Sequence, residues 1–455
     1  MAQLRIALTF ILTAVTFVAG SIAQDSQMDF EKSKHDNWHQ WRGPNASGVA
    51  SKGNPPKTWS EDSNIKWKTA IDGEGSSTPI IWGEQVFILS AKETDRAPAV
   101  KPEQHPDQVP PPPEHTVEFF VSSYDRATGK EQWKKTVTEA TATESHHVST
   151  TFAAASPTTD GKHLFASFGS YGIFCLTLDG ELVWEQDLGD MRTRRGWGEA
   201  VSPVLHDDKL VVNWDQEDQS QIFVLNAKDG KVIWKTDREE PTTWATPFIA
   251  QTSGSDVTQL VTNGTTAVRS YNLENGEIVW KAPGTTLNAI PCPVRSGDNV
   301  ICMSGYRGSM AYAIDLNSKG ELSAKNVGAD QSLKWKIPQY TPYVPSPIIL
   351  GSRLYFNRSL AATISCYNVK TGEPIYDRPV RLPGLKNLYA SPVAVKDRIY
   401  FASREGKTIV IGNGDEFDVI ATNTLDNGID ASPAIVGDQI FIRSSKHLYC
   451  IEASQ

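Results

Sequence analysis

The sequence predicts an all-β protein made of eight similar units, and three observations lead to this fold class. Short runs of β-branched and aromatic residues alternate with Gly, Pro, Asn and Asp, a pattern typical of strands joined by tight turns. A set of equivalent positions recurs at a spacing of about 45 residues. The eighth unit lacks its last strand, and a matching strand occurs near the N-terminus.

Each unit is expected to contain four antiparallel strands, A to D, in a fixed order. Strand A follows a Pro, usually preceded by Ser or Thr, and these prolines are Pro79, Pro157, Pro203, Pro247, Pro291, Pro347, Pro392 and Pro433. Strand C ends at a turn with Gly, as at Gly129, Gly180, Gly230, Gly276 and Gly372. Strand D then carries a bulky residue, which is Trp133, Trp184, Trp234, Trp280 and Trp335 in five units.

The eighth unit ends at Ile451 with no Trp after it, and the missing strand matches residues 65–68, which include Trp67. A ring closed by its own two ends explains this displacement, because closure leaves no radial edge between the first and last units. An open solenoid would instead need capping units. We therefore predict an eight-bladed β-propeller closed by an N-terminal strand, with the six repeat Trp residues packed between blades.

Two units depart from the pattern. An insertion around residues 317–331 displaces Trp335 in the fifth unit. In the seventh unit, Ile420 and Glu416 occupy the positions where other units carry Trp and Gly. The seventh blade is therefore predicted to be the least regular.

Composition excludes several classes of protein. Helix-forming residues are not concentrated anywhere after residue 30, which excludes an all-α, coiled-coil or polytopic membrane protein. The formal net charge is −9, from 44 basic and 53 acidic residues. Because nucleic-acid binding rests largely on neutralising phosphates, we expect no nucleic-acid partner.

The N-terminus predicts export. Arg5 is the only charged residue before Asp25, and an apolar run at residues 6–19 is followed by small residues that end at Ala23. This pattern is typical of a signal peptide at residues 1–23. The apolar run is shorter than the roughly 20 residues of a membrane span, and no Cys follows the cleavage site. We expect a periplasmic or secreted monomer with no membrane anchor after cleavage.

The repeat resembles a known family. The segments Ser156-Pro157…Leu182-Val183-Trp184 and Ser202-Pro203…Gly230-Lys231-Val232-Ile233-Trp234 resemble the PQQ-like, or quinoprotein-type, β-propeller repeat. Quinoprotein alcohol dehydrogenases and BamB-like proteins share this repeat. The resemblance covers residues 59–452, so we expect the propeller at 59–455 and an N-terminal extension at 24–58. In the extension, Trp38-His39-Gln40-Trp41-Arg42-Gly43-Pro44 resembles the opening of secreted bacterial members of unassigned function.

Two function classes remain, because a propeller does not by itself imply an activity. Resemblance to BamB-like members implies a non-catalytic exported scaffold that binds a protein or an anionic polymer through its loop face. Resemblance to quinoprotein dehydrogenases implies an oxidoreductase that holds PQQ between a Trp and a vicinal disulfide, beside a Ca²⁺ bound by a carboxylate and an amide. The five cysteines include no adjacent pair, and no Cys-x-x-Cys-His haem motif is present. The first class, with no cofactor, is therefore favoured.

Loop placement predicts a candidate binding site. With strand A innermost, the D–A and B–C connections lie on one face and the Asp-rich A–B and C–D turns on the other. The first face should form a basic channel mouth from Arg192, Arg194, Arg195, Trp197, Trp244, Arg307, Arg358 and Arg404, near Asp215 and Glu217. Such a mouth would bind an anionic group. Alternatively, Glu199, Asp215, Glu217 and Glu405 neutralise these arginines.

Asp215 and Glu217 also have oxygens suited to a metal, but a solvated turn explains them more simply, and we expect no metal.

Two local features leave alternatives open. Cys292 and Cys302 flank the turn at residues 296–298, so they should face each other across a hairpin; export permits a disulfide there, although strand geometry can prevent it. Cys175, Cys366 and Cys450 lie at an equivalent strand position of their units and are expected in the core.

Residues 91–118 form a Pro-rich insertion between strands B and C of the first blade. It is either a docking segment, a lid or a tolerated surface loop.

Overall fold

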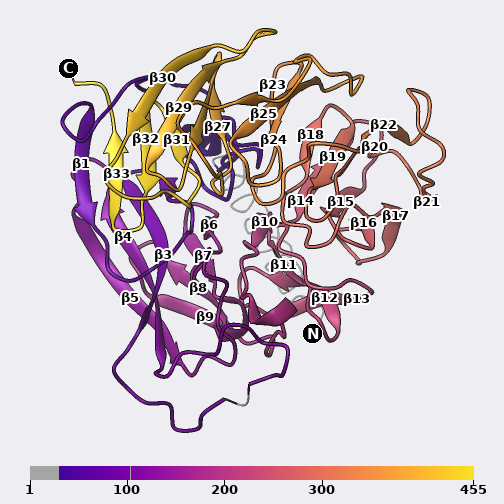
Figure 1. Ribbon diagram of the computed structural model, residues 1–455. Coiled ribbons are helices and arrows are strands. Elements are labelled where there is room, and N and C mark those ends of the chain that lie inside the picture. Colours follow the sequence, from indigo (N-terminus) through magenta and orange to yellow (C-terminus); the bar gives the residue numbers. More distant parts are fainter. Residues whose placement is uncertain (1–29, 103, 455) are drawn as a thin grey trace, which may run out of the picture.

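The computed structural model describes residues 30–102 and 104–454; the expected signal peptide lies outside them. In this part of the chain, eight β-sheets are arranged in a ring (Figure 1), which is the eight-bladed β-propeller that the repeat predicts. Three short 3-10 helices accompany the strands: η1 (Lys34–Asp36), η2 (Gly169–Tyr171) and η3 (Arg194–Gly196). No helix among the described residues is long and apolar enough to cross a membrane.

The first four blades follow one another along the chain. Blade 1 contains β2 (Ile80–Trp82), β3 (Gln85–Glu93), β4 (Val117–Asp125) and β5 (Glu131–Ala140). Blade 2 contains β6 (Thr158–Thr159), β7 (His163–Ser167), β8 (Ile173–Thr177) and β9 (Leu182–Gln186). Blade 3 contains β10 (Val204–His206), β11 (Lys209–Trp214), β12 (Ser220–Asn226) and β13 (Val232–Arg238). Blade 4 contains β14 (Phe248–Gln251), β15 (Thr258–Thr262), β16 (Ala267–Asn272) and β17 (Ile278–Pro283).

The remaining blades complete the ring. Blade 5 contains β18 (Val294–Ser296), β19 (Asn299–Ser304), β20 (Met310–Asp315) and β22 (Leu333–Ile337). Blade 6 contains β23 (Ile348–Leu350), β24 (Arg353–Asn357), β25 (Thr363–Asn368) and β26 (Val380–Arg381). Blade 7 contains β27 (Val393–Val395), β28 (Arg398–Ala402), β29 (Lys407–Gly412) and β30 (Val419–Thr424). Blade 8 contains β31 (Ala434–Val436), β32 (Gln439–Arg443), β33 (His447–Ile451) and β1 (Ile65–Ala70).

The N-terminal strand closes the ring. β1 pairs antiparallel with β33, with Trp67 opposite Cys450 and Ala70 opposite His447. Figure 1 shows these two strands side by side, although they come from opposite ends of the colour range. The sheet edge of blade 8 is therefore covered by the chain's own start.

Five of the six repeat Trp residues pack against the Gly turn of the following blade. A Cβ added at Gly129 would lie 2.6 Å from the Trp67 ring, and one at Gly230 would lie 2.7 Å from Trp184. These glycines also have positive φ (71° at Gly230), which a side chain would oppose. The indole N–H donates to a carbonyl of the same turn region at 2.9–3.0 Å, in the pairs Trp67–Arg126, Trp133–Leu178, Trp184–Ala227, Trp234–Leu273 and Trp335–Val369. Gly and Trp recur together because the turn needs both for this contact.

Blade 4 differs from the expected four strands. The insertion in blade 5 forms β21 (Gly320–Glu321), which pairs parallel with β17 and becomes a fifth strand of blade 4. It covers Trp280, which is fully buried and donates its N–H to the Gln259 side chain at 2.9 Å instead of to a neighbouring turn.

The prediction that blade 7 is the least regular is wrong. Its outer strand β30 has six residues, whereas the outer strand β26 of blade 6 has two. In blade 6, Tyr376 replaces the Trp, and its ring contacts Tyr355 and Phe417. The side chain at a single repeat position therefore does not determine how long the outer strand pairs.

All five cysteines are free and buried. The expectation that Cys292 and Cys302 face each other is wrong by one residue, because the turn between β18 and β19 has Ser296 opposite Asn299 and Val294 opposite Ile301. Continuing this register places Met303 opposite Cys292. Cys302 points into the core between blades 4 and 5 instead. Cys175, Cys366 and Cys450 lie in the core, where burial raises the pKa of each thiol to about 12.

Candidate functional site

The N-terminal segment 37–59 lies across the face that carries the A–B turns. It begins beside blade 1, where Trp38 forms a β-bridge with Ile81. It then reaches blade 7, where the Ala50 amide donates to the Ala394 carbonyl at 2.8 Å, and blade 8, where the Asn54 amide donates to the Asp438 carboxylate at 2.6 Å. Between these contacts it also reaches blades 5 and 6, through the bonds from Trp41 to Cys292 and from Arg42 to Pro347, so the segment crosses this end of the central channel.

The motif Trp-x-x-Trp-Arg-Gly-Pro shapes this segment at the channel. A Cβ on Gly43, whose φ is 76°, would lie 2.8 Å from the Trp38 ring, so only Gly permits this fold of the chain. Arg42 is buried and donates to the carbonyls of Ser47 (2.8 Å) and Pro347 (2.5 Å). Burial lowers the pKa of Arg42 to about 10. Trp41 points into the channel and donates its indole N–H to the Cys292 sulfur at 3.2 Å. The motif therefore provides the floor of the channel.

Above Trp41, the channel is a cavity of about 440 Å³. This volume lies in the range that holds small ligands. Six aromatic side chains contribute to its wall, and each is only partly buried: Trp197, Trp244, Tyr306, Tyr343, Tyr389 and His147. Trp197 lies 6.3 Å from Trp244 between ring centroids, and Tyr306 stacks on Tyr343 at 4.7 Å. We call these six residues the aromatic collar.

A ring of hydroxyl groups surrounds the cavity just above the floor. Its members, which we call the hydroxyl ring, each precede the Pro of strand A: Ser156, Ser202, Thr246, Ser346, Ser391 and Ser432. Each oxygen accepts the backbone N–H of the equivalent residue one blade earlier at 2.9–3.1 Å. Cys292 occupies the same position in blade 5, so the equivalent Pro of that blade is Pro293, not Pro291. These bonds between blades explain why Ser or Thr recurs before Pro.

None of the predicted arginines lines this cavity itself; Arg195 and Arg307 lie over Trp197 and Tyr306, which do line it, and most of the predicted arginines carry no paired carboxylate. Arg194, Arg195, Arg307 and Arg358 form no ion pair within the part of the chain that the structure describes. Three of them lie over aromatic rings: Arg195 over Trp197, Arg307 over Tyr306 and Arg358 over Tyr340, at 5.4–6.0 Å. We call these four residues the arginine rim.

Two predicted arginines are neutralised by carboxylates that the sequence did not indicate. Arg192 pairs with Asp218 at 2.8 Å and with Asp107 of the Pro-rich insertion at 3.6 Å. Arg404 pairs with Asp430 at 2.8 Å and lies over the Tyr389 ring at 4.3 Å. Their charges contribute less to the field at the mouth than those of the arginine rim.

The acidic residues proposed as neutralising partners have other roles. Asp215 is buried and binds Arg238 through two hydrogen bonds of 2.7 and 3.0 Å. Glu217 accepts from the backbone and hydroxyl of Thr242 at 3.2 and 2.8 Å. Both therefore hold loops of blades 3 and 4, and they are not joined in one metal-binding pair. Among the described residues, no group of three or more His, Cys, Asp or Glu side chains is arranged to hold a metal ion.

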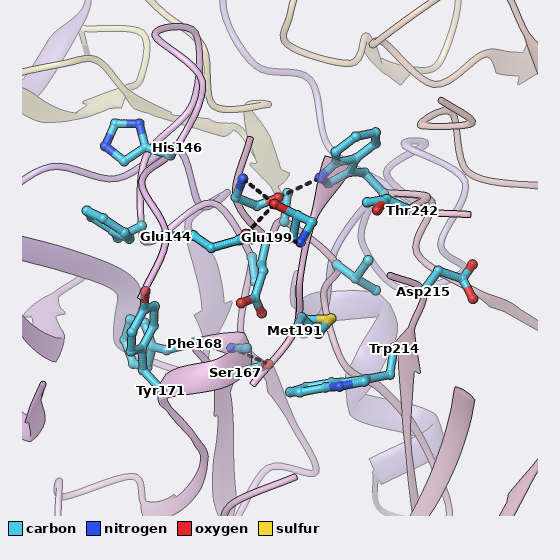
Figure 2. Close-up of a pocket in the computed structure, with 18 of the residues that line it drawn as sticks. Glu144, His146, Ser167, Phe168, Tyr171, Met191, Glu199, Trp214, Asp215 and Thr242 are labelled. Atoms are coloured by element: carbon cyan, nitrogen blue, oxygen red, sulfur yellow. Dashed lines mark hydrogen bonds between the residues drawn. The ribbon is translucent and has the colours of Figure 1, made fainter. Parts of the chain in front are cut away.

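Sequence reasoning missed a second, smaller cavity of about 30 Å³ beside the mouth, between the loops of blades 1, 2 and 3 (Figure 2). Glu199 accepts from the amide and hydroxyl of Ser170 at 2.9 and 2.5 Å, and Glu144 accepts from the Thr193 hydroxyl at 2.5 Å. Burial raises the pKa of Glu199 to about 8, and it also raises the pKa of Glu144. The hydrogen bonds of the two glutamates hold the loop at residues 190–199. A cavity of this volume holds about one water molecule and is too small for a ligand.

The Pro-rich insertion packs against that loop. The part outside the strands spans residues 94–116, because β3 and β4 extend further than expected. The Val109 amide donates to the Arg195 carbonyl at 2.9 Å, and the Gln108 side chain, which is buried, donates to the Thr143 carbonyl at 3.2 Å. The insertion thus supports the backbone of Arg195 at the edge of the mouth.

The residues of the channel do not match those that the quinoprotein resemblance requires. The floor does carry an indole, Trp41, but the cavity is lined by a single cysteine, Cys292, whose sulfur accepts from that indole. The one carboxylate of the lining, Asp430, is bound to Arg404. This set contains neither a vicinal cysteine pair nor a free carboxylate and amide for Ca²⁺. The lining of this cavity therefore does not fit PQQ with its Ca²⁺.

Comparison with known proteins agrees with the fold. The family model described as outer membrane protein assembly factor BamB matches residues 118–378, which is more than half of the chain. No curated protein matches the sequence. Among solved structures, BamB from Moraxella catarrhalis is 13% identical, with a TM-score of 0.53, over 81% of this chain and 98% of that one.

Quinoprotein enzymes have similar folds. A europium-containing methanol dehydrogenase is 10% identical, with a TM-score of 0.61, over 92% of this chain and 91% of that one. A quinohemoprotein alcohol dehydrogenase from Comamonas testosteroni is 9% identical, with a TM-score of 0.63, over 96% and 84%. At these identities the likeness concerns the fold alone.

The collar tyrosines and Trp41 were not predicted as site residues. Tyr306, Tyr343 and Tyr389 lie in loops of blades 5 to 7, where an isolated aromatic residue has no periodic signal. The sequence analysis selected arginines because they lie on equivalent loops. Selecting the aromatic residues of those same loops as well would have identified the tyrosines.

Proposed function

This chain belongs to the family of the outer membrane protein assembly factor BamB, and on that premise we propose that it is an exported, non-catalytic binding protein. In this proposal the channel mouth binds an anionic partner, either a protein segment or an anionic polymer. What supports the proposal is the asymmetry of the channel: segment 37–59 crosses one end, while Arg195 and Arg307 lie over Trp197 and Tyr306, two aromatic residues of the cavity wall toward the other end.

The charge of the rim supports an anionic partner. The protein as a whole is acidic, with a formal net charge of −9, yet four arginines without ion pairs gather at one opening. A guanidinium grips a carboxylate, sulfate or phosphate through two parallel hydrogen bonds. A contact of this kind contributes about 1.5–3 kcal/mol when desolvated, and much less when it remains in water.

Backbone geometry also supports a binding role. Arg195 and Arg307 have φ of 57° and 51°, in the left-handed region that non-glycine residues rarely adopt. Such conformations cost about 1 kcal/mol or more and concentrate at functional sites. The backbone at these positions would suit glycine better, so the arginine side chains are not there for backbone reasons.

Retention on an immobilised anionic polymer tests the proposal. The purified chain should bind polyglutamate or dextran sulfate resin at low salt and elute as salt rises, because screening weakens charge contacts. Charge reversal with Arg194→Glu and Arg195→Glu should abolish retention and leave the fold intact. A matched control reverses Arg295 and Arg353, which pair with Asp298 and Asp415 away from the mouth, and should retain binding.

Two results would overturn the proposal. Equal loss of retention in the control variant would show that binding follows net charge and not the mouth. Quinone absorbance and dye reduction with alcohols, after addition of PQQ and Ca²⁺, would show that the protein is an oxidoreductase. The export part is tested separately, since recovery of the full-length, uncleaved chain from the cytoplasm would contradict it.

A further inference from the structure

The cavity below the arginine rim suggests what kind of anionic partner it receives. We propose that it binds the terminal sugar of an acidic glycan, whose carboxylate or sulfate groups lie at the rim. This inference rests on the proposed function and names the ligand class of the same site. Three features of the cavity carry it: the hydroxyl ring, the aromatic collar and the distribution of charge with depth.

The hydroxyl ring supplies hydrogen-bond donors that have no acceptor in the protein. Each of the six oxygens accepts a backbone N–H from the neighbouring blade. A hydroxyl also carries one proton to donate, and none of the six donates to an acceptor in the described part of the chain. Their exposed fractions are 1–6%, so these groups are almost entirely buried around the cavity that they line. The fold therefore uses each hydroxyl oxygen as an acceptor and leaves its proton available to donate to a ligand.

The number of these donors favours a sugar. A carboxylate offers about four lone-pair positions on two adjacent oxygens, which cannot reach six donors spaced around a ring. An extended peptide presents one carbonyl per residue, on alternating sides. A pyranose carries oxygens around its whole circumference, and this distribution matches a circular set of donors.

The aromatic collar fits the faces of a sugar ring. The Trp197 and Trp244 planes differ by 32°, and Tyr306 stacks on Tyr343 at 29°, so in each pair the rings support one another and their remaining surfaces contribute to the cavity wall. The Trp244 indole N–H is already bound to the Gly198 carbonyl at 2.7 Å, which fixes the orientation of that ring. Carbon-bound hydrogens on a pyranose face pack against such π surfaces, which carry partial negative charge.

Charge changes with depth in the cavity. The Arg404–Asp430 ion pair in the wall is neutral overall. His147 is neutral as well, because burial, and then the nearby Arg404, lowers its pKa. Burial raises the pKa of the Tyr343 phenol, which stays uncharged. The deep part therefore suits an uncharged group rich in oxygen, while the arginine rim suits anionic groups that remain outside.

The closed floor restricts the ligand to a chain end or a short molecule. Trp41 lies beneath the cavity, and its indole is held by Cys292. Trp41 stands between this cavity and a wider one of about 1260 Å³ toward the other face, so a polymer meets the Trp41 ring at the floor, and a terminal unit fits the space above it.

Calorimetric titration of the full mature chain tests this inference with ligands matched in length. Tetragalacturonate and a sulfated carrageenan tetrasaccharide represent the two sources of an acidic sugar. Tetraglutamate carries a comparable charge without a sugar ring, and maltotetraose has sugar rings without charge. We expect at least one acidic tetrasaccharide to bind at least about tenfold more tightly than both of these controls, a difference of about 1.4 kcal/mol.

Substitutions at two positions separate the contribution of the collar from that of the hydroxyl ring. Trp197→Ala should weaken the acidic tetrasaccharide at least about tenfold, and Trp197→Phe should restore most of the affinity. Ser202→Cys keeps a shape that blade 5 already accommodates at Cys292 but weakens the donor, so it should also reduce affinity. Ser202→Cys should leave retention on polyglutamate resin unchanged, because that retention depends on the arginine rim, whereas Trp197→Ala also removes the ring beneath Arg195 and is judged against Trp197→Phe instead.

Each contrary outcome has a distinct meaning. If tetraglutamate binds as tightly as both acidic sugars, the sugar inference is wrong while the proposed anion binding stands. If maltotetraose binds equally well, the rim takes no part and the acidic-glycan inference is wrong. If no tetrasaccharide binds although polyglutamate resin retains the protein, the inference again fails alone. If neither the resin nor any titrated ligand binds, the proposed function fails with it.

Discussion

Replacing Trp67 with Ala should destabilise the whole ring, because this residue joins its two ends. Trp67 is 8% exposed, packs on Phe441 with centroids 6.0 Å apart, and donates its indole N–H to the Arg126 carbonyl at 2.9 Å. Removal of a buried Trp side chain costs about 3–5 kcal/mol. Unfolding entropy of about 2.1 cal/mol/K per residue, over the roughly 390 residues of the ring, gives about 0.8 kcal/mol/K. The expected fall in Tm is therefore about 4–6 °C.

Differential scanning calorimetry measures this change. Trp67→Phe keeps most of the packing and loses mainly the hydrogen bond, so its Tm should fall by only about 1–2 °C. Trp197→Ala, at the partly exposed channel mouth, removes a ring of equal size and should change Tm less than Trp67→Ala. An unchanged Tm in Trp67→Ala would refute the argument that β1 holds the ring closed. Deletion of residues 24–70 should lower Tm further.

Three other predictions concern titration, local stability and thiols. The pKa of Glu199 is raised to about 8, so the folded state prefers its protonated form; the free energy of unfolding should fall as pH rises from about 4.5 to about 8, and Glu199→Gln should flatten this dependence in urea titrations. Hydrogen exchange should be faster in β26 of blade 6 than in β13 of blade 3, and equal protection would contradict the shorter pairing of β26. Thiol titration of the unreduced, denatured protein should find five free thiols, and a count of three would indicate a disulfide.

The arrangement of the blades was predictable because it depends on local, repeated chemistry. A Trp such as Trp184 needs a Gly at the neighbouring turn, here Gly230, and the same pair recurs at fixed spacing along the chain. The displaced Trp67 identified ring closure, since a strand missing at one end was present at the other. These contacts are the same in five of the eight repeats, so the periodicity of the sequence reveals them without knowledge of the tertiary structure.

The candidate site was predicted only in part. The D–A and B–C loops that carry Arg194, Arg195, Arg307 and Arg358 were assigned from strand order alone. Their freedom from carboxylates was not predictable, because ion pairing depends on distances between loops of different blades. Arg404, on an equivalent loop, is instead paired with Asp430.

The sequence by itself determined the fold class, the number of blades, the closing strand and the face on which the basic loops lie, because all of these follow from the order and spacing of residues. Only the tertiary structure decided that Trp41 forms the floor of the channel. It also decided that the strand register places Cys302 one residue away from the position opposite Cys292, and that the hydroxyl groups of the hydroxyl ring have no acceptor in the described part of the chain. The physical reason is that these properties depend on which segments, far apart in the chain, meet at the central axis. A period of about 45 residues predicts that such segments converge there, but it does not predict which of their side chains pair and which remain available.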